Sequence, residues 1–425
     1  MTDASALQAA QQPAQAPFNG TLKISVTSAL GLIPIANAQI VISYTGDPEN
    51  PIGTYTTDSS GQTGDITLPA PDPALSLSPS EIQPYSEYNI SVTAPDYEPV
   101  TISGSEILSG EMSLQTVRMN PLSVDSGAKD VVIIPAHTLF GEYPPKIPEP
   151  EIKPMDESGE IVLSRVVVPE YVIVHDGVPS DSTAPNYWVR YRDYIKNVAS
   201  CEIYSTWPEA ALYANVLAIM SFTLNRVYTE YYRNRGYDFT ITSSTAYDQK
   251  WVYGRNIFEN IDYLVDTVFA NYLSRPGVLQ PILTSYCDGQ RVTCNGLSQW
   301  GSRYLADEGY SAIEIIRYYY GNDMYINTAT LISGVPSSYP GYDLGIGSSG
   351  EKVRQLQNQL NRIARNYPAI PTIAADGIYG PKTAESVRIF QGIFDLPRTG
   401  VTDYATWYEI SEIFVGVSRI AEPGQ

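Results

Sequence analysis

The sequence has few residues of the kinds that most often bind metals or act as nucleophiles. Its 425 residues include 3 cysteines and 2 histidines. Cys287 and Cys294 lie seven positions apart, a spacing compatible with a disulfide, with half of a zinc site or with two free thiols. Neither His137 nor His175 lies near this pair, so we predict no metal site and no cofactor. A mechanism of the Ser-His-Asp or Cys-His type would need His175, which follows a strand-like run and which we interpret as structural.

Basic residues and long apolar runs are also scarce. Lysine and arginine number 26 against 46 acidic residues, which gives a net charge of −20. Nucleic acid is therefore not an expected partner. No run approaches the ~18 consecutive apolar residues of a membrane span, so no membrane partner is expected. Residues 1–17 are rich in Ala, Gln and Pro and lack a basic start followed by an apolar core, so we predict no secretory signal.

Chain length and tyrosine content indicate domain number and a possible type of ligand. A chain of this length suggests about three domains. Tyrosine is abundant, with 33 residues against 9 phenylalanines. A tyrosine ring combines a flat apolar face with a hydrogen-bonding tip, a combination that suits sugar rings. Most of these tyrosines are equally compatible with ordinary packing in strands and helices.

One stretch near the middle of the chain places an acid on an apolar helix face. The spacing predicts a helix over residues 189–203, with Tyr191, Ile195 and Val198 on one stripe that Glu202 continues. Burial disfavours the charged form of a carboxyl group, so the pKa of Glu202 should be raised. A carboxyl group that is protonated near neutral pH suits cleavage of a glycosidic bond, whose leaving oxygen must receive a proton. The alternative is that Glu202 only caps or pairs locally.

A second predicted helix follows directly. Thr206 as N-cap and Glu209 three residues later form a capping-box pattern. Residues 210–225 carry no charge and have apolar residues at three-to-four spacing. We therefore expect a buried helix that packs beneath Glu202.

Four motifs in order resemble the stage II sporulation protein D domain, a family that cleaves the glycan strands of peptidoglycan. The first runs from Tyr194-Ile195-Lys196-Asn197-Val198 through Cys201-Glu202 to Trp207-Pro208-Glu209-Ala210 and Asn215-Val216-Leu217-Ala218. The others are Tyr247-Asp248-Gln249 with Tyr253-Gly254, then Ser285-Tyr286-Cys287-Asp288-Gly289, then Gly296-Leu297-Ser298-Gln299-Trp300-Gly301 with Tyr318-Tyr319-Tyr320-Gly321. The resemblance covers about 150 residues.

This resemblance implies roles for individual residues. It makes Glu202 the catalytic acid, and it implies that Gln249, Tyr253, Ser298 and Gln299 position the glycan. Asp248 is the best candidate in sequence order for a second acid, and it could equally bind sugar hydroxyls or cap a helix. Some members of the family bind zinc at the loop that matches Cys287, but they use histidine as well.

The segments on either side predict further domains. Residues 19–120, after a disordered tail at 1–18, alternate like the strands of an antiparallel β-sandwich and resemble carboxypeptidase-regulatory-like modules. Residues 121–165 form a Pro-rich connector that we expect to be extended. Residues 166–340 form the α+β catalytic domain.

Residues 341–425 resemble the three-helix peptidoglycan-binding domain of wall hydrolases. The pattern consists of Leu344-x2-Gly347-x2-Gly350-x2-Val353-x2-Leu356-Gln357, the turn Asp376-Gly377-Ile378-Tyr379-Gly380, then Phe390-Gln391 and Thr406-Trp407. The resemblance implies that Asp376, Gly377 and Tyr379 contact the wall. Thr399 departs from the pattern, because the second turn usually carries Asp there.

The whole order of domains resembles the clostridial spore cortex-lytic enzymes, which are made as prepro-forms. We therefore expect a multidomain α+β enzyme that cuts the β-1,4 bond between N-acetylmuramic acid and N-acetylglucosamine in spore cortex during germination. A single convincing acid favours a lytic transglycosylase that leaves 1,6-anhydro-muramic ends. The alternatives are a hydrolytic N-acetylmuramidase and a non-catalytic activator of another hydrolase. The resemblance implies synthesis in the mother-cell cytoplasm and a place in the spore cortex or coat region.

The connector also suggests regulation. An enzyme that cuts the cortex must stay silent in a dormant spore, and the extended segment 121–165 could lie along a glycan groove. Residues 155–160 are polar and should be exposed, which is where proteolytic nicking concentrates. Arg165 is the only basic residue between Lys153 and Arg190. We predict cleavage by an activating protease at Arg165–Val166, the alternative being a plain linker.

Overall fold

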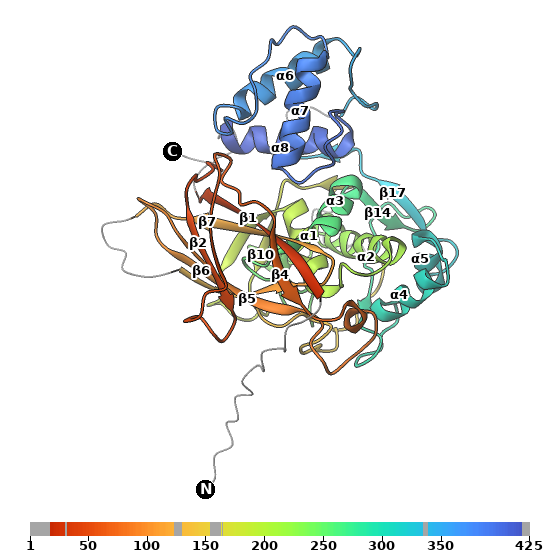
Figure 1. The fold of residues 1–425 in the computed structure, drawn as a ribbon. Coiled ribbons are helices and arrows are strands. Elements are labelled where there is room, and N and C mark those ends of the chain that lie inside the picture. The colour runs from red at the N-terminus through yellow and green to blue at the C-terminus, as the bar shows by residue number, and fades with distance from the viewer. Residues whose placement is uncertain are drawn as a thin grey trace.

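The computed structural model describes residues 18–29, 32–122, 130–153, 163, 165–334 and 339–418. Within these ranges the protein is a multidomain α+β structure with several sheets and helices α1 to α8 (Figure 1). The tail predicted at residues 1–18 lies outside the described residues except for Phe18, which begins the first strand.

Two sheets form most of the N-terminal region. One has the order β13-β7-β1-β4 and the other the order β3-β2-β5-β6-β8. Alternate residues of these strands enter one hydrophobic cluster, which includes Leu22, Ile40 and Ile90. The strands are β1 (Phe18–Ser28), β2 (Gln39–Tyr44), β3 (Gly53–Thr56), β4 (Ile66–Ala70), β5 (Ser86–Thr93), β6 (Val100–Ile107), β7 (Met112–Met119) and β8 (Asp130–Ile133), with a 3-10 turn at Pro73–Ser76.

These sheets differ from the expected antiparallel arrangement of residues 19–120 in two ways. The pairs β1–β7 and β6–β8 are parallel. Two strands also come from outside that segment, β8 from the connector and β13 (Ile257–Phe258) from the central domain. Buried side chains reinforce this shared sheet, because Arg255 forms an ion pair with Glu106 and Asn256 bonds to the Glu106 backbone.

The central region is built around α1 (Tyr191–Glu202) and α2 (Glu209–Tyr228). The expected helix 189–203 is confirmed to within two residues. α2 is long and apolar enough to span a membrane by length and composition, and 83% of its most apolar window is buried inside the protein. Helix α2 begins at Glu209 with Pro208 at its N-cap, so the expected Thr206 cap is wrong. Thr206 instead hydrogen-bonds Ser76 of the N-terminal region.

The remaining elements of the central region surround these two helices. They are β9 (Val167–Val168), β10 (Tyr171–His175), β11 (Asn186–Arg190), a 3-10 turn at Arg233–Arg235, β12 (Ile241–Thr242), α3 (Glu259–Val268), β14 (Asn271–Ser274), β15 (Tyr286–Cys287), β16 (Leu297–Ser298), α4 (Gln299–Asp307), α5 (Ala312–Tyr320), β17 (Tyr325–Thr328) and β18 (Leu331–Ile332). Strands β9 and β18 pair in parallel, so the two ends of this region meet.

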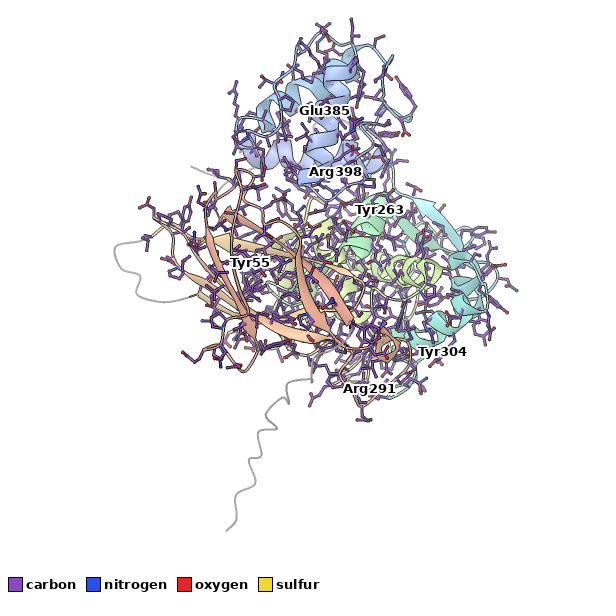
Figure 2. All side chains as sticks on the ribbon, viewed as in Figure 1. Tyr55, Tyr263, Arg291, Tyr304, Glu385 and Arg398 are labelled. Carbon is purple, nitrogen blue, oxygen red and sulfur yellow. A yellow bond between two sulfur atoms is a disulfide. The ribbon has the colours of Figure 1, made fainter. Side chains whose placement is uncertain are left out.

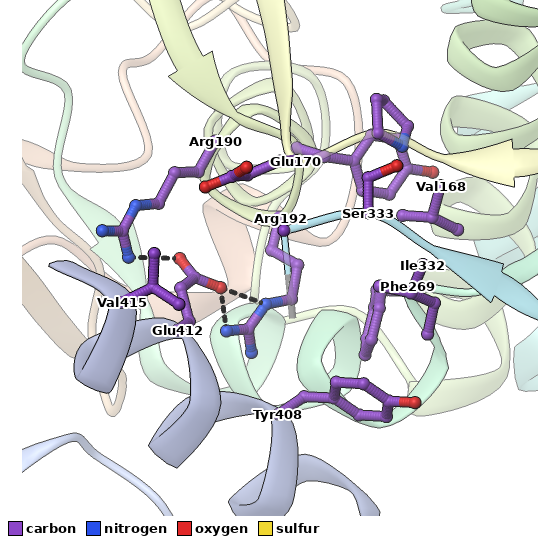
Figure 3. A pocket seen from close by; sticks show the side chains of 13 residues that line it. Val168, Glu170, Arg190, Arg192, Phe269, Ile332, Ser333, Tyr408, Glu412 and Val415 are labelled. Atoms are coloured by element: carbon purple, nitrogen blue, oxygen red, sulfur yellow. Dashed lines mark hydrogen bonds and ion pairs between the residues drawn. The ribbon is translucent and has the colours of Figure 1, made fainter. Parts of the chain in front are cut away.

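Helices α6 (Glu351–Ile363), α7 (Pro381–Ile393) and α8 (Tyr404–Ser418) form the C-terminal region, drawn in blue in Figure 1. This region contacts both others. Glu412 of α8 forms ion pairs with Arg190 and Arg192, beside a small pocket that Phe269 and Tyr408 also line (Figure 3). Lys23 of β1 forms an ion pair with Asp395 just beyond α7.

Candidate active site

Glu202 is the last residue of α1 and is fully buried, at 0% exposure. Its Oε1 accepts a hydrogen bond from the Lys250 backbone N–H at 2.7 Å. Its Oε2 is buried and makes no hydrogen bond of good geometry with the described residues, although the Tyr286 hydroxyl lies close enough to the carboxyl group to lower its pKa. Burial raises the pKa of Glu202 above its ordinary value, against the attraction of Lys146 and the hydrogen bond from Lys250. The protonated form of this carboxyl group is therefore more favoured than in a solvent-exposed glutamate.

Three side chains surround this carboxyl group. Tyr286 lies at the start of β15, and Tyr143 and Lys146 come from the Pro-rich connector. Burial and then the charge of Glu202 raise the pKa of both tyrosines well above its usual value. The Tyr286 hydroxyl interacts with the Glu202 carboxyl group, which lowers the pKa of Glu202 and raises that of Tyr286. The Tyr143 hydroxyl has no hydrogen-bond partner in the described parts of the chain. Lys146 Nζ lies 4.1 Å from the centre of the Tyr286 ring and donates to the Asp248 carbonyl. The centre thus combines one acid with several buried polar groups.

The connector is held across this centre by contacts on both sides of Lys146. On the N-terminal side, Arg291 (Figure 2) donates to the carbonyls of Thr138, at 2.8 Å, and Gly141. On the C-terminal side, Glu149 forms an ion pair with buried Arg226 and Glu151 forms one with Arg275.

Backbone hydrogen bonds add to these contacts. The Ile147 N–H donates to the Ala246 carbonyl at 2.8 Å, and the Leu283 N–H donates to Glu151 at 2.8 Å. The connector therefore supplies Tyr143 and Lys146, whose groups interact electrostatically with the Glu202 carboxyl group, and is fixed on both sides of them.

Asp248 is buried like Glu202, but all of its acceptor capacity is used. Oδ1 accepts from Arg226 Nε at 2.7 Å. Oδ2 accepts from the Tyr232 hydroxyl at 2.7 Å and from the backbone and hydroxyl of Thr242 at 2.9 and 2.7 Å. The structure therefore gives Asp248 the environment of an internal ion pair.

The other predicted glycan-positioning residues lie in different surroundings. Gln249 is buried and bonds Tyr194, Thr223 and the Ile219 carbonyl, all within the core. Ser298 caps α4 by accepting from the Gly301 N–H at 2.9 Å. Gln299 is buried, and neither atom of its side-chain amide has a partner among the described residues. Tyr253 is 43% exposed and stacks on Tyr187, on a surface that Glu202 does not line.

Cys287 and Cys294 form a disulfide, which decides between the alternatives that the sequence left open. Cys201 is the free cysteine, and it is buried beside Glu202 in the chain. Within the described ranges, no group of three or more His, Cys, Asp or Glu side chains could hold a metal ion.

The residues predicted to contact the wall divide between surface and core. Asp376 is exposed, and its carboxylate accepts from the Ile378 N–H and the Gln357 side chain. Gly377 is buried with a φ of +78°, a conformation that favours glycine. Tyr379 is fully buried and its hydroxyl contacts Gly400 and Thr402, so in this structure its ring is part of the core of the C-terminal region.

At the predicted processing site, Arg165 is exposed and Val166 is buried. The polar stretch 155–160, expected to be exposed, lies outside the described residues.

Residues 349–410 match the family model described as "Putative peptidoglycan binding domain". This match covers α6, α7 and part of α8, and it supports peptidoglycan as a binding partner and a function related to the cell wall.

Among curated proteins, the chain is similar to the zinc D-Ala-D-Ala carboxypeptidase of Streptomyces albus G, with 38% identity over 71 residues. The match covers 16% of this chain and 26% of the relative, so the chain spans about a quarter of that relative's length.

Two solved structures show weak likeness. The minor pilin GBS52 of Streptococcus agalactiae has a TM-score of 0.19 and 14% identity, with 26% of this chain and 48% of that chain covered. Chlorocatechol 1,2-dioxygenase of Pseudomonas putida has a TM-score of 0.15 and 12% identity, with 28% and 61% covered. Neither carries an argument about this protein.

Sequence reasoning missed several groups around Glu202. Tyr286 lies in a motif that had been noted, but its contact with Glu202 depends on β15 pairing with β16. Tyr143 and Lys146 lie in the Pro-rich connector, whose composition predicts an extended chain and says nothing about which side chains turn inward. The sequence does not indicate that the Lys250 N–H bonds to Glu202, because every residue except proline carries the same backbone donor.

Proposed function

We propose that the protein cleaves the β-1,4 bond between N-acetylmuramic acid and N-acetylglucosamine in peptidoglycan, as a lytic transglycosylase that uses Glu202 as acid and base. The observation that carries this proposal is the state of the Glu202 carboxyl group. It is buried, its pKa is raised, and Oε2 makes no hydrogen bond of good geometry within the described chain, with the Tyr286 hydroxyl beside the carboxyl group. The peptidoglycan-binding family match at residues 349–410 supports the choice of polymer.

The proposed reaction needs one carboxyl group in two roles. Protonated Glu202 gives its proton to the glycosidic oxygen as the bond from C1 of N-acetylmuramic acid to that oxygen breaks. The resulting carboxylate then takes the proton of the C6 hydroxyl of the same sugar, whose oxygen bonds to C1 and closes a 1,6-anhydro ring. Glu202 ends the cycle protonated, as it began. No second acid is required, which agrees with the engagement of Asp248 by Arg226 and its other partners.

We further propose that this chain is an inactive precursor and that proteolysis near Arg165–Val166 activates it. Tyr143 and Lys146 lie near enough to Glu202 to interact with its charge, and the Glu149–Arg226 and Glu151–Arg275 ion pairs hold the segment that carries them. A glycan strand cannot reach Glu202 until this segment moves. The same proposal includes three more specific assignments. Residues 19–120 form a carboxypeptidase-regulatory-like β-sandwich, residues 341–425 form a three-helix wall-binding domain, and the protein acts on spore cortex during germination.

The test uses the whole chain with a site for a specific protease placed within residues 155–162. Intact and nicked protein are incubated with purified spore peptidoglycan, and the products are analysed by mass spectrometry. We expect 1,6-anhydro-muramic ends from the nicked protein and at most traces from the intact one. Reducing muramic ends would favour a hydrolytic muramidase, and no cleavage by the nicked chain would favour a wall-binding activator. Equal rates before and after nicking would refute the precursor.

A further inference from the structure

A long groove lies apart from the Glu202 centre, between the N-terminal sheets and the face of the central domain formed by β11 and α1. It provides about 610 Å³ of space. One side carries residues of β1 and β7, such as Thr27 and Gln115, and the other carries β11. Residues around α7 and α8, including Asp395 and Gly416, line it as well. The groove therefore borders all three regions, and Glu202 does not line it.

Aromatic rings line the groove on both faces of β11, with Tyr187 on one face and Trp188, which packs against Tyr171, on the other. Tyr187 and Tyr253 are stacked with ring centres 4.9 Å apart, and Trp251 packs against Tyr187 at 5.4 Å. Trp188, next in β11, is 69% exposed, whereas the four other tryptophans are at most 5% exposed. Exposing so much of a tryptophan ring to water is unfavourable, so a ligand that covered the ring would gain free energy.

Polar side chains without internal partners border the same groove. Arg118 and Asp130 line it, and no side-chain hydrogen bond or ion pair joins either of them to the described residues, whereas Asp193, which also lines it, interacts with the charge of Arg190. Asp130 is close enough to Tyr187 to contribute to its raised pKa, after burial, Asp176 and Tyr253. Flat aromatic faces beside free donors and acceptors match the chemistry of a sugar, which presents apolar C–H faces and hydroxyl and acetamido edges.

We propose that this groove is a second glycan-binding site, with Trp188 and Tyr253 as stacking platforms for an N-acetylated, β-1,4-linked strand. The polymer is assigned from the proposed function and from the peptidoglycan-binding family match of the region that borders the groove. The site itself depends on no chemistry at Glu202. A protein partner would bury rings of this kind too, but it would not call for the row of unpaired polar groups beside them.

The exposure of Trp188 gives a direct measurement on the intact, un-nicked chain. Because the other tryptophans are buried, acrylamide quenching of fluorescence reports mainly Trp188. Adding the N-acetylglucosamine hexamer should reduce the quenching. Binding of the same hexamer, measured by calorimetry, should weaken about tenfold in Trp188→Ala and less in Trp188→Phe, which keeps an aromatic face. Tyr253→Ala should also weaken binding, and Tyr318→Ala, which removes an exposed tyrosine of α5 outside the groove, should not.

Several results would overturn the proposal. These are unchanged quenching at saturating hexamer, wild-type affinity in Trp188→Ala, equal protection by cellohexaose, which lacks acetamido groups, and protection that depends on protein concentration instead of sugar. The last result would show that the rings meet another protein chain. The fluorescence assay measures sugar binding at Trp188 and does not depend on cleavage. If the lytic function were wrong, the fluorescence response would remain, whereas if the groove did not bind sugar, the response would be absent.

Discussion

Glu202 and Asp248 are both completely buried carboxyl groups of the central region, yet their surroundings differ. Asp248 accepts four hydrogen bonds, one of them from Arg226. Glu202 accepts one well-formed hydrogen bond, from a backbone N–H, and its second oxygen makes none of good geometry within the described chain, with only the Tyr286 hydroxyl interacting with the carboxyl group as a side-chain donor. A buried acid whose acceptors are all used stabilises the fold, whereas one that keeps a free oxygen costs stability and is available for chemistry. The comparison separates the two acids that the sequence offered as a pair.

The largest expected effect is on catalysis at Glu202. In the nicked chain, Glu202→Gln removes the transferable proton and keeps the shape of the side chain, so cleavage of peptidoglycan should fall at least about 100-fold. Glu308→Gln, at an exposed position on the same domain, is the matched control. Product release measured by mass spectrometry and binding to insoluble peptidoglycan separate lost chemistry from lost binding. Near-normal cleavage in Glu202→Gln would remove Glu202 from the mechanism.

Asp248 should show the opposite behaviour. Asp248→Ala leaves Arg226 buried without one of its two carboxylates and leaves Tyr232 without its acceptor. Breaking a buried ion pair in this way costs about 3–5 kcal/mol. We expect the free energy of unfolding in urea to fall by that amount, and turnover per folded molecule to change far less than in Glu202→Gln. A stable but inactive Asp248→Ala would restore Asp248 as a second acid and favour hydrolysis.

The pH dependence of stability sharpens the same comparison. The pKa of Glu202 is raised in the folded state, so the folded protein holds this proton over a pH range in which the unfolded chain has lost it. The contribution of Glu202 to the free energy of unfolding therefore decreases as pH rises from the unfolded pKa through the folded pKa. Below the unfolded pKa both states are protonated and the contribution is constant.

Glu202→Gln removes this dependence. The variant should match the wild type near about pH 4 and become the more stable protein as pH rises toward neutrality. Thermal unfolding across that range measures the difference. Glu385→Gln, on the exposed face of α7 (Figure 2), controls for the chemical change itself. A constant difference between Glu202→Gln and wild type at all pH values would contradict the burial argument.

The sequence predicts one of these acids better than the other, for a physical reason. Helical periodicity places Glu202 on the apolar face of α1, and the structure confirms both the helix and the burial. Asp248 follows no periodic element, and its partners Arg226, Tyr232 and Thr242 come from three separate segments. The order of motifs predicts that Asp248 and its partners belong to one region. Which of them hydrogen-bond to the Asp248 carboxylate depends on how their segments pack together in the fold.

The domain boundaries illustrate the same limit. Strand alternation predicts most of the N-terminal strands, but not that β13, whose Ile257 pairs with Leu114, joins β7 from far along the chain. A two-residue strand carries no period of its own, so its pairing follows from the buried Glu106–Arg255 and Asn256 contacts beside it. The composition of the Pro-rich connector does not indicate that Tyr143 and Lys146 lie near Glu202, because it does not show which side chains turn inward.

The smallest expected effect is on wall binding by the C-terminal region, where a buried and an exposed side chain can be compared in the same way. The Tyr379 side chain is fully buried and its hydroxyl is hydrogen-bonded, whereas the side chain of its neighbour Ile378, at the same turn, is 60% exposed. If exposed groups there contact the wall, Ile378→Ser should weaken binding of the full chain to insoluble peptidoglycan about fivefold, corresponding to about 1 kcal/mol of lost apolar contact. Stability should be almost unchanged, because the side chain contributes little to the core.

Tyr379→Phe is the matched control for this turn. It removes the hydroxyl that contacts Gly400 and Thr402, so it should lower the free energy of unfolding by about 1 kcal/mol and leave wall binding intact. Sedimentation with insoluble peptidoglycan and urea unfolding, measured on both variants, give the four values needed. Weakened binding in Tyr379→Phe together with wild-type binding in Ile378→Ser would mean that the ligand reaches the buried ring. In that case, hydrogen-bond partners inside the protein would not distinguish structural residues from wall-binding residues in this region.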